Sequence, residues 1–102
     1  MYAQIVFPVS APGLYTYRVE GELALRVRVG ARVFAEFGRK SIWGYVFKLV
    51  ESADREKLKP VLSVGAEAHF LSPEYVKFLL WLSDYYLAPP GEVLRAAFSK
   101  AF

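Results

Sequence analysis

The chain contains no cysteine and a single histidine, His69. The absence of cysteine excludes a disulfide-stabilised scaffold, a thiolate zinc site and a cysteine nucleophile. One histidine leaves a histidine-based metal cluster without ligands. We therefore expect no metal site, and we expect His69 to lie at the surface or at a boundary rather than in a catalytic centre.

Long apolar segments are also missing. In the helical part the longest apolar run, Phe78–Leu82, is far shorter than the about 20 residues that span a bilayer. The first residues lack the basic segment that opens a signal peptide. We expect a soluble protein of the cytoplasm with no membrane partner.

No enzyme motif is present. The segment Gly38-Arg39-Lys40-Ser41 departs from a phosphate-binding loop, because Val33 stands at the position of the first glycine and the lysine does not follow Gly38 directly. The carboxylates are scattered and none is a clear general base. We expect no catalytic residue and no cofactor in this chain.

What is present suits one small α+β domain. With 102 residues, of which 55% are hydrophobic, the chain can fill a single core. We treat 1–102 as one domain, with a β-rich part at 1–51, a connector at 52–71 and a helical part at 72–102. Closely spaced turns in the first part favour a small antiparallel barrel or strongly twisted sheet.

The β-rich part contains five candidate strands. Four of them are Ala3–Val9, Leu14–Val19, Ala31–Phe37 and Ser41–Glu51, separated by glycine-containing turns at 12–13, 20–22 and 38–40. The fifth is predicted at 25–29, where Leu25, Val27 and Val29 alternate with Arg26 and Arg28. Another short strand can follow Pro60 in the connector.

Two helices are predicted in the last third. Ser72 is a good N-cap with Pro73 at the first helical position, and the second helix covers Glu92–Phe98 after Pro89-Pro90-Gly91. The first helix has a broad apolar surface, made of Val76, Phe78, Leu79, Leu80, Leu82, Tyr85 and Tyr86. Trp81 shares the opposite stripe with charged residues, so it is either partly buried at the helix margin or a contact to a neighbouring domain.

The basic residues cluster between positions 26 and 40. Arginine or lysine stands at positions 26, 28, 32, 39 and 40, whereas Glu36 is the one acidic residue there. Basic side chains beside aromatic rings suit a nucleic-acid surface, since phosphates pair with cations and bases stack on rings. The alternative is that these arginines keep the solvent face of a sheet soluble.

The order of these landmarks resembles the amino-terminal domain of the PriA family of replication restart helicases, also called primosomal protein N-prime. The resemblance extends over essentially all 102 residues, and its most specific part is Asp84-Tyr85-Tyr86 followed by Pro90-Gly91-Glu92-Val93-Leu94. The other matching segments are Val6–Val9, Tyr15–Tyr17, Gly30–Val33, Phe37–Arg39, Gly44–Val46 and Leu58–Val61.

This resemblance implies a module that binds the 3′ end of a DNA strand at a stalled replication fork. In the family, an ATP-driven helicase of 3′-to-5′ polarity and a cysteine-rich zinc region follow this module, so ATP, magnesium and zinc belong to regions that this chain lacks. The implied partners are DNA 3′ ends and forked DNA. Primosome proteins and single-strand-binding protein are implied through the parent protein, in the bacterial nucleoid.

The resemblance also implies residue roles. Tyr15 would be the aromatic wall against the terminal base, Gly38 the position of close approach and Lys59 the basic contact. Thr16 departs from the family aspartate, keeping a hydroxyl but losing the charge. Tyr17 completes this DNA-end set, and Arg39 and Lys40 are candidate backbone contacts. Two hypotheses compete with this one: a protein-docking domain of the primosome that does not touch DNA, and a small barrel that binds RNA.

Overall fold

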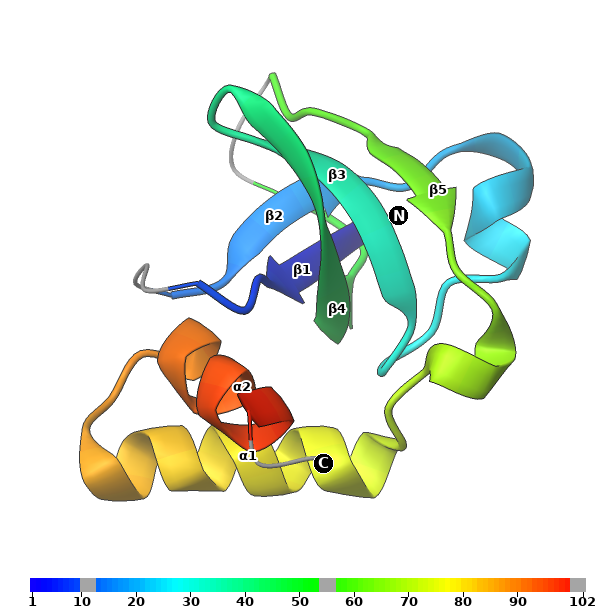
Figure 1. Cartoon of the computed structure of the whole chain (residues 1–102). Coiled ribbons are helices and arrows are strands. Elements are labelled where there is room, and N and C mark those ends of the chain that lie inside the picture. The colour runs from blue at the N-terminus through cyan, green and yellow to red at the C-terminus, as the bar shows by residue number, and fades with distance from the viewer. Residues whose placement is uncertain (10–12, 54–56, 100–102) are drawn as a thin grey trace.

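The computed structural model describes residues 1–9, 13–53 and 57–99. It contains a five-stranded antiparallel sheet followed by two helices, which confirms the predicted fold class (Figure 1). The elements are β1 (Tyr2–Val6), β2 (Tyr15–Arg18), the 3-10 helix η1 (Gly21–Leu25), β3 (Arg32–Phe37), β4 (Lys40–Val50), β5 (Val61–Val64), the 3-10 helix η2 (Glu67–His69), α1 (Pro73–Tyr86) and α2 (Pro90–Ser99).

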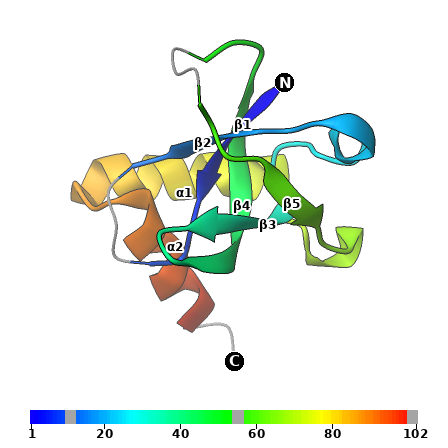
Figure 2. The same cartoon turned by 90° about the horizontal axis from the view of Figure 1, so that it is seen from above.

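The sheet curls into a half-barrel with strand order β2-β1-β4-β3-β5. Register shifts after Gln4 in β1 and after Phe34 in β3 increase the local twist, and Figure 2 shows β3 running across the direction of β1. The chain just before β5 returns to β2, where the backbone N–H of Arg18 donates to the carbonyl of Lys59 at 2.9 Å. The two edges of the sheet therefore meet through this segment.

The long strand β4 separates two hydrophobic cores. Its side chains alternate between the faces of the sheet. Val46 therefore lies fully buried inside the half-barrel, while Tyr45 and Phe47 pack against the helices. On the helical side they contact Val76 and Leu79 of α1 and Leu94 of α2. Truncating a ring buried like Phe47 to alanine destabilises a fold by about 3–5 kcal/mol. The contacts of Tyr45 and Phe47 with α1 and α2 therefore hold the helices to the sheet.

The helix boundaries follow local chemistry. The hydroxyl of Ser72 accepts a hydrogen bond of 3.1 Å from the backbone N–H of Tyr75, as expected of an N-cap, and Pro73 is the first helical residue. Helix α1 ends at Tyr86, and the next residue, Leu87, caps it in a left-handed conformation with φ 52°. Both predicted helices are confirmed, with α2 starting two residues earlier than expected because Pro90 occupies its first turn.

The strand predicted at 25–29 is wrong. Residues Gly21–Leu25 form η1, and the following backbone N–H groups of Arg26 and Val27 both donate to the carbonyl of Leu23. Their hydrogen bonds are thus local and no strand ladder forms. Of the three alternating apolar residues, Val27 is buried and Val29 is partly buried against the helical-side core, whereas Leu25 is 87% exposed.

Candidate nucleic-acid interface

One open pocket of about 480 Å3 brings together the five residues that the resemblance assigns to DNA-end binding. Its walls come from β2, from the end of β3 with the hairpin turn, and from the segment that precedes β5. The residues that line it are Leu14, Tyr15, Thr16, Tyr17, Glu36, Phe37, Gly38, Lys57, Leu58 and Lys59. Segments separated by about twenty residues in sequence therefore build one site.

Tyr15 forms part of an aromatic wall. Its ring lies 5.1 Å from that of Phe37 and 6.2 Å from that of Phe7, between ring centroids. In the β1–β2 register Tyr15 pairs with the buried Ile5, so it lies on the concave side of the sheet. The side chain is half-buried, and it supports the core while leaving part of its ring open to the pocket.

Tyr17 lies deeper and is engaged by the protein. Only 6% of the residue is exposed, and its hydroxyl donates a hydrogen bond of 2.6 Å to the backbone carbonyl of Glu36. Burial, with smaller contributions from Glu36 and Tyr15, raises the pKa of Tyr17 to about 12. The phenol is therefore neutral at physiological pH, and its hydrogen bond links β2 to β3.

Thr16 contributes backbone polar groups to the pocket. The backbone N–H of Arg18 points away from β1, because it donates to Lys59. Groups two residues apart in a strand point the same way, so the N–H and carbonyl of Thr16 also face the open side of β2. These groups are available to hydrogen-bond a base edge or a hydroxyl, whichever side chain stands at position 16.

Gly38 is the first residue of the two-residue turn that joins β3 to β4. Phe37 pairs with Lys40 across this turn. Gly38 has φ +65°, a backbone angle that residues other than glycine rarely adopt. An added Cβ would meet open space. The turn explains the glycine, and the same open space lets a ligand come close to the backbone.

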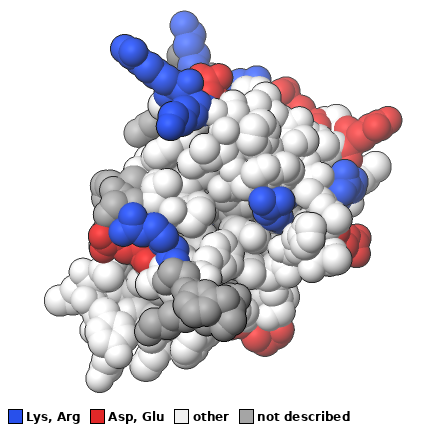
Figure 3. All heavy atoms as spheres, in the orientation of Figure 1, with Lys and Arg blue, Asp and Glu red and all other residues white. Residues whose placement is uncertain are grey.

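Charged groups surround the mouth of the pocket. The ammonium of Lys59 lies 2.9 Å from Oε1 of Glu36, and both side chains are about half exposed. Lys57 is also part of the lining. Arg39 in the hairpin turn and Lys40 at the start of β4 are exposed next to the pocket but do not line it. In Figure 3 basic side chains gather at the end of this hairpin.

Trp81 lies apart from this pocket, on α1. The residue is 57% exposed and belongs to a row of aromatic rings with Tyr75, Phe78 and Tyr85, in which neighbouring ring centroids are 5.1–6.3 Å apart. The broad apolar surface predicted for this helix is thus only partly packed. Val76 and Leu79 are buried, whereas Phe78 and Tyr85 are not.

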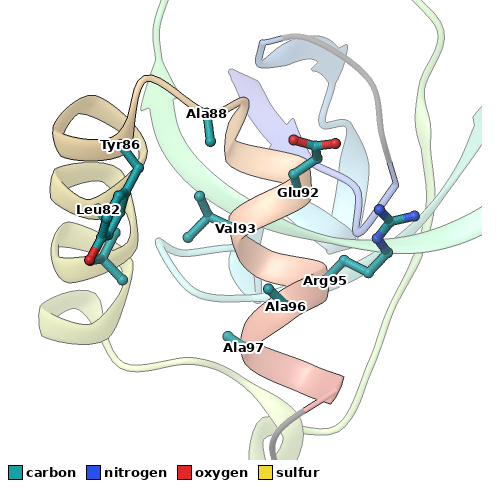
Figure 4. A pocket seen from close by; sticks show the side chains of 8 residues that line it. All are labelled: Leu82, Tyr86, Ala88, Glu92, Val93, Arg95, Ala96 and Ala97. Carbon is teal, nitrogen blue, oxygen red and sulfur yellow. The ribbon is translucent and has the colours of Figure 1, made fainter.

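A second hollow lies between the two helices (Figure 4). It measures about 840 Å3 and is mainly apolar, with Glu92 and Arg95 as its charged lining residues. Its other lining residues are Leu82, Tyr86, Ala88, Val93, Ala96 and Ala97. This chemistry does not suit a phosphate, so the pocket beside β2 is the better candidate for an anionic ligand.

Sequence reasoning missed half of the lining: Leu14, Glu36, Phe37, Lys57 and Leu58. Glu36 and Phe37 precede the Gly38 turn, so their proximity to Gly38 was available as a signal. Their position opposite β2 was not, because it depends on how the sheet curls. Within the described ranges, no group of three or more histidine, aspartate or glutamate side chains is placed to hold a metal ion. Nor is any helix there long and apolar enough to cross a membrane.

The open pocket of the half-barrel combines an aromatic wall, outward-facing backbone polar groups and two lysines, which is the chemistry of a small binding domain. Comparison with known sequences gives the family. The sequence pattern of the PriA 3′DNA-binding domain (3′BD) matches residues 4–99. The chain therefore belongs to the family of PriA 3′ DNA-binding domains, which confirms the resemblance seen in the sequence.

Curated relatives named replication restart protein PriA are similar to this chain. The protein of Synechocystis sp. is 34% identical over 89 residues, covering 83% of this chain and 10% of the relative. That of Haemophilus influenzae is 30% identical over 96 residues, covering 92% and 13%. That of Chlamydia muridarum is 25% identical over 100 residues, covering 92% and 13%. The chain thus spans roughly a tenth to an eighth of these relatives' length.

Proposed function

We propose that this domain binds the 3′-terminal nucleotide of a DNA strand at a stalled replication fork, within a replication restart helicase. The observation that carries the proposal is the single pocket around which Tyr15, Thr16, Tyr17, Gly38 and Lys59 gather. Its volume of about 480 Å3 falls within the range of about 300–1,000 Å3 that is usual for small-molecule sites. A pocket of this volume suits one nucleotide better than a long strand.

Each wall of the pocket has a chemical task in this proposal. The open part of the Tyr15 ring stacks on the terminal base. The backbone N–H and carbonyl of Thr16, together with its hydroxyl, hydrogen-bond the base edge or the sugar. Gly38 lets the strand end approach the hairpin turn, and Lys59 pairs with the phosphate of the last linkage. Arg39 and Lys40 contact the phosphate backbone just outside the pocket.

The requirement for a strand end gives the test. Competition binding compares a linear single strand with a circular strand of the same sequence and length, each displacing a short labelled linear strand from the domain. We expect the linear strand to compete strongly and the circular one only weakly. Equal competition by both would contradict end recognition and favour a general strand-binding groove.

The rest of the proposal concerns the whole protein. ATP-driven 3′-to-5′ unwinding, with its magnesium and zinc, would reside in regions outside these 102 residues, and the domain would act in the cytoplasm on nucleoid DNA. Contacts to primosome proteins and to single-strand-binding protein would likewise be made by the parent protein. In this proposal the domain binds DNA and catalyses nothing by itself.

A second candidate function is protein docking without DNA contact. The exposed aromatic row of α1 favours it, since contiguous exposed aromatic side chains mark interaction surfaces. In this reading Trp81 is the central contact to a neighbouring domain or primosome protein. Titration with a short single strand at low salt separates the two candidates, because a docking domain gives no binding there.

A further inference from the structure

The pocket contains a carboxylate that neither the sequence motifs nor the family roles assign. Glu36 is the one acidic side chain among the described residues that line it. About half of this side chain is exposed, and Oε1 accepts a hydrogen bond of 2.9 Å from Lys59 Nζ. A carboxylate can accept about four hydrogen bonds, so Glu36 can accept a further one from a ligand.

The protein holds Glu36 in place from two sides. Its backbone carbonyl accepts the hydroxyl of Tyr17 at 2.6 Å, which ties the end of β3 to β2 across the pocket. Its side chain is tied to Lys59, on the segment before β5. All three walls of the pocket thus meet at this residue.

The chemistry of the strand end explains why a carboxylate matters there. A terminal 3′-hydroxyl can donate a hydrogen bond, and an ionised carboxylate is an acceptor with a full negative charge. A 3′-phosphate has no comparable donor when ionised and carries negative charge that Glu36 repels. The hydroxyl of Thr16 is neutral, so it cannot reject a phosphate by charge.

We propose that Glu36 is the residue that selects a 3′-hydroxyl end, by accepting its hydrogen bond and repelling a 3′-phosphate. The inference rests on the proposed end-binding function. Lys59 acts in two ways in this arrangement. Its ammonium orients the Glu36 carboxylate, and it also pairs with the last internucleotide phosphate.

Glu36→Gln tests the assignment because it removes the charge and keeps the size. The exposed ion pair with Lys59 contributes little to stability, and the hydrogen bond from Tyr17 goes to the backbone, so the fold stays intact. The matched control is Glu67→Gln. Glu67 is also exposed and ion-paired, to Arg28 at 3.4 Å, but it does not line the pocket.

Fluorescence anisotropy with three strands that differ only at the 3′ end, hydroxyl, phosphate or hydrogen, gives the readout. The wild type should prefer the hydroxyl over both others by roughly three- to tenfold. Glu36→Gln should bring the hydroxyl-to-phosphate ratio close to one, because the negative charge is lost. It should only reduce the hydroxyl-to-hydrogen ratio, because the amide oxygen still accepts a weaker hydrogen bond. Glu67→Gln should leave both ratios as in the wild type.

The experiment distinguishes a failure of the Glu36 assignment from a failure of the proposed end-binding function. If the wild type prefers the hydroxyl and Glu36→Gln keeps both ratios, Glu36 is not the selector, while end recognition stands. An equal loss of preference in Glu67→Gln, or an unchanged hydroxyl-to-phosphate ratio in Glu36→Gln, also overturns the assignment. If the wild type itself shows no preference, the selector role falls, and the linear-against-circular comparison decides whether end binding falls with it.

Discussion

The hydroxyl of Tyr17 lies 2.6 Å from the backbone carbonyl oxygen of Glu36, to which it donates a hydrogen bond. This contact joins residues nineteen positions apart and fixes the distance between β2 and the end of β3. The walls of the pocket are therefore set by a side chain whose ring belongs to the core. Substitutions at Tyr17 should lower the stability of the domain, and they should affect binding only as a consequence of that loss.

Tyr17→Phe should destabilise the domain by about 0.5–1.5 kcal/mol at pH 8, since one hydrogen bond is lost. The folded pKa of about 12 lies above the ordinary value of 10.0. The contribution of the protonated phenol is thus fully present below pH 10 and is lost as pH rises from 10 towards 12. In urea unfolding, the stability gap between wild type and Tyr17→Phe should shrink between pH 8 and pH 11.5. A gap that stays constant would contradict the raised pKa.

Tyr15→Ala should weaken DNA binding by about 1–3 kcal/mol, because the stacking surface for the terminal base is lost. Tyr15→Phe is the matched control: it keeps the ring and should bind nearly as well as the wild type. Anisotropy measures binding, and circular dichroism gives the folded fraction. If Tyr15→Ala unfolds the domain and the folded molecules bind normally, the ring serves only the core.

Thr16→Asp should sharpen base preference more than it changes overall affinity. An aspartate accepts hydrogen bonds from base amino groups and also repels the phosphate backbone, so the two effects on affinity oppose each other. Four strands that differ only in the last base, each titrated with both proteins, measure the preference. An unchanged ranking of the four would mean that side chain 16 does not face the base.

The dependence of affinity on salt should be shallow. A pocket for one terminal nucleotide touches few phosphates, and two to three contacts give a slope of log affinity on log salt of about −1.4 to −2.1. Lys59→Ala should flatten that slope by nearly one contact. Arg26→Ala should leave it almost unchanged, since Arg26 does not line the pocket and donates to the carbonyl of Gly65.

The opposite pattern would point to another surface. If Arg26 matters and Lys59 does not, the strand follows the basic residues of positions 26–40. A slope steeper than about −3.5 would support the same conclusion, because it requires most of that cluster. Either result would replace the terminal pocket with a general basic groove.

Local sequence signals predicted the elements that depend on local chemistry. The cap at Ser72 and the turn at Gly38 are each decided within a few residues, and the structure contains them. The prediction of a strand at 25–29 failed because a period of two does not show whether a neighbouring strand is there to pair with. At that place Gly21 starts a 3-10 helix instead.

The candidate site was predictable only in part. Tyr15, Gly38 and Lys59 were named through family resemblance, and nothing in their spacing placed them in one pocket. Glu36 was missed as a site residue because its contacts to Tyr17 and Lys59 join residues about twenty positions apart. Such contacts depend on the curl of the sheet. Likewise, the periodicity of α1 could not tell which of its aromatic rings lie against the sheet and which lie in solvent.

The central claim is recognition of a free 3′-hydroxyl end, and one comparison tests it most directly. Anisotropy titrations of the wild-type domain use two single strands of identical sequence, one ending in a 3′-hydroxyl and the other in a 3′-phosphate. The proposal predicts several-fold weaker binding of the phosphorylated strand, since the added group meets like-charge repulsion from Glu36. Equal affinity for the two strands would contradict recognition of a free 3′-hydroxyl end.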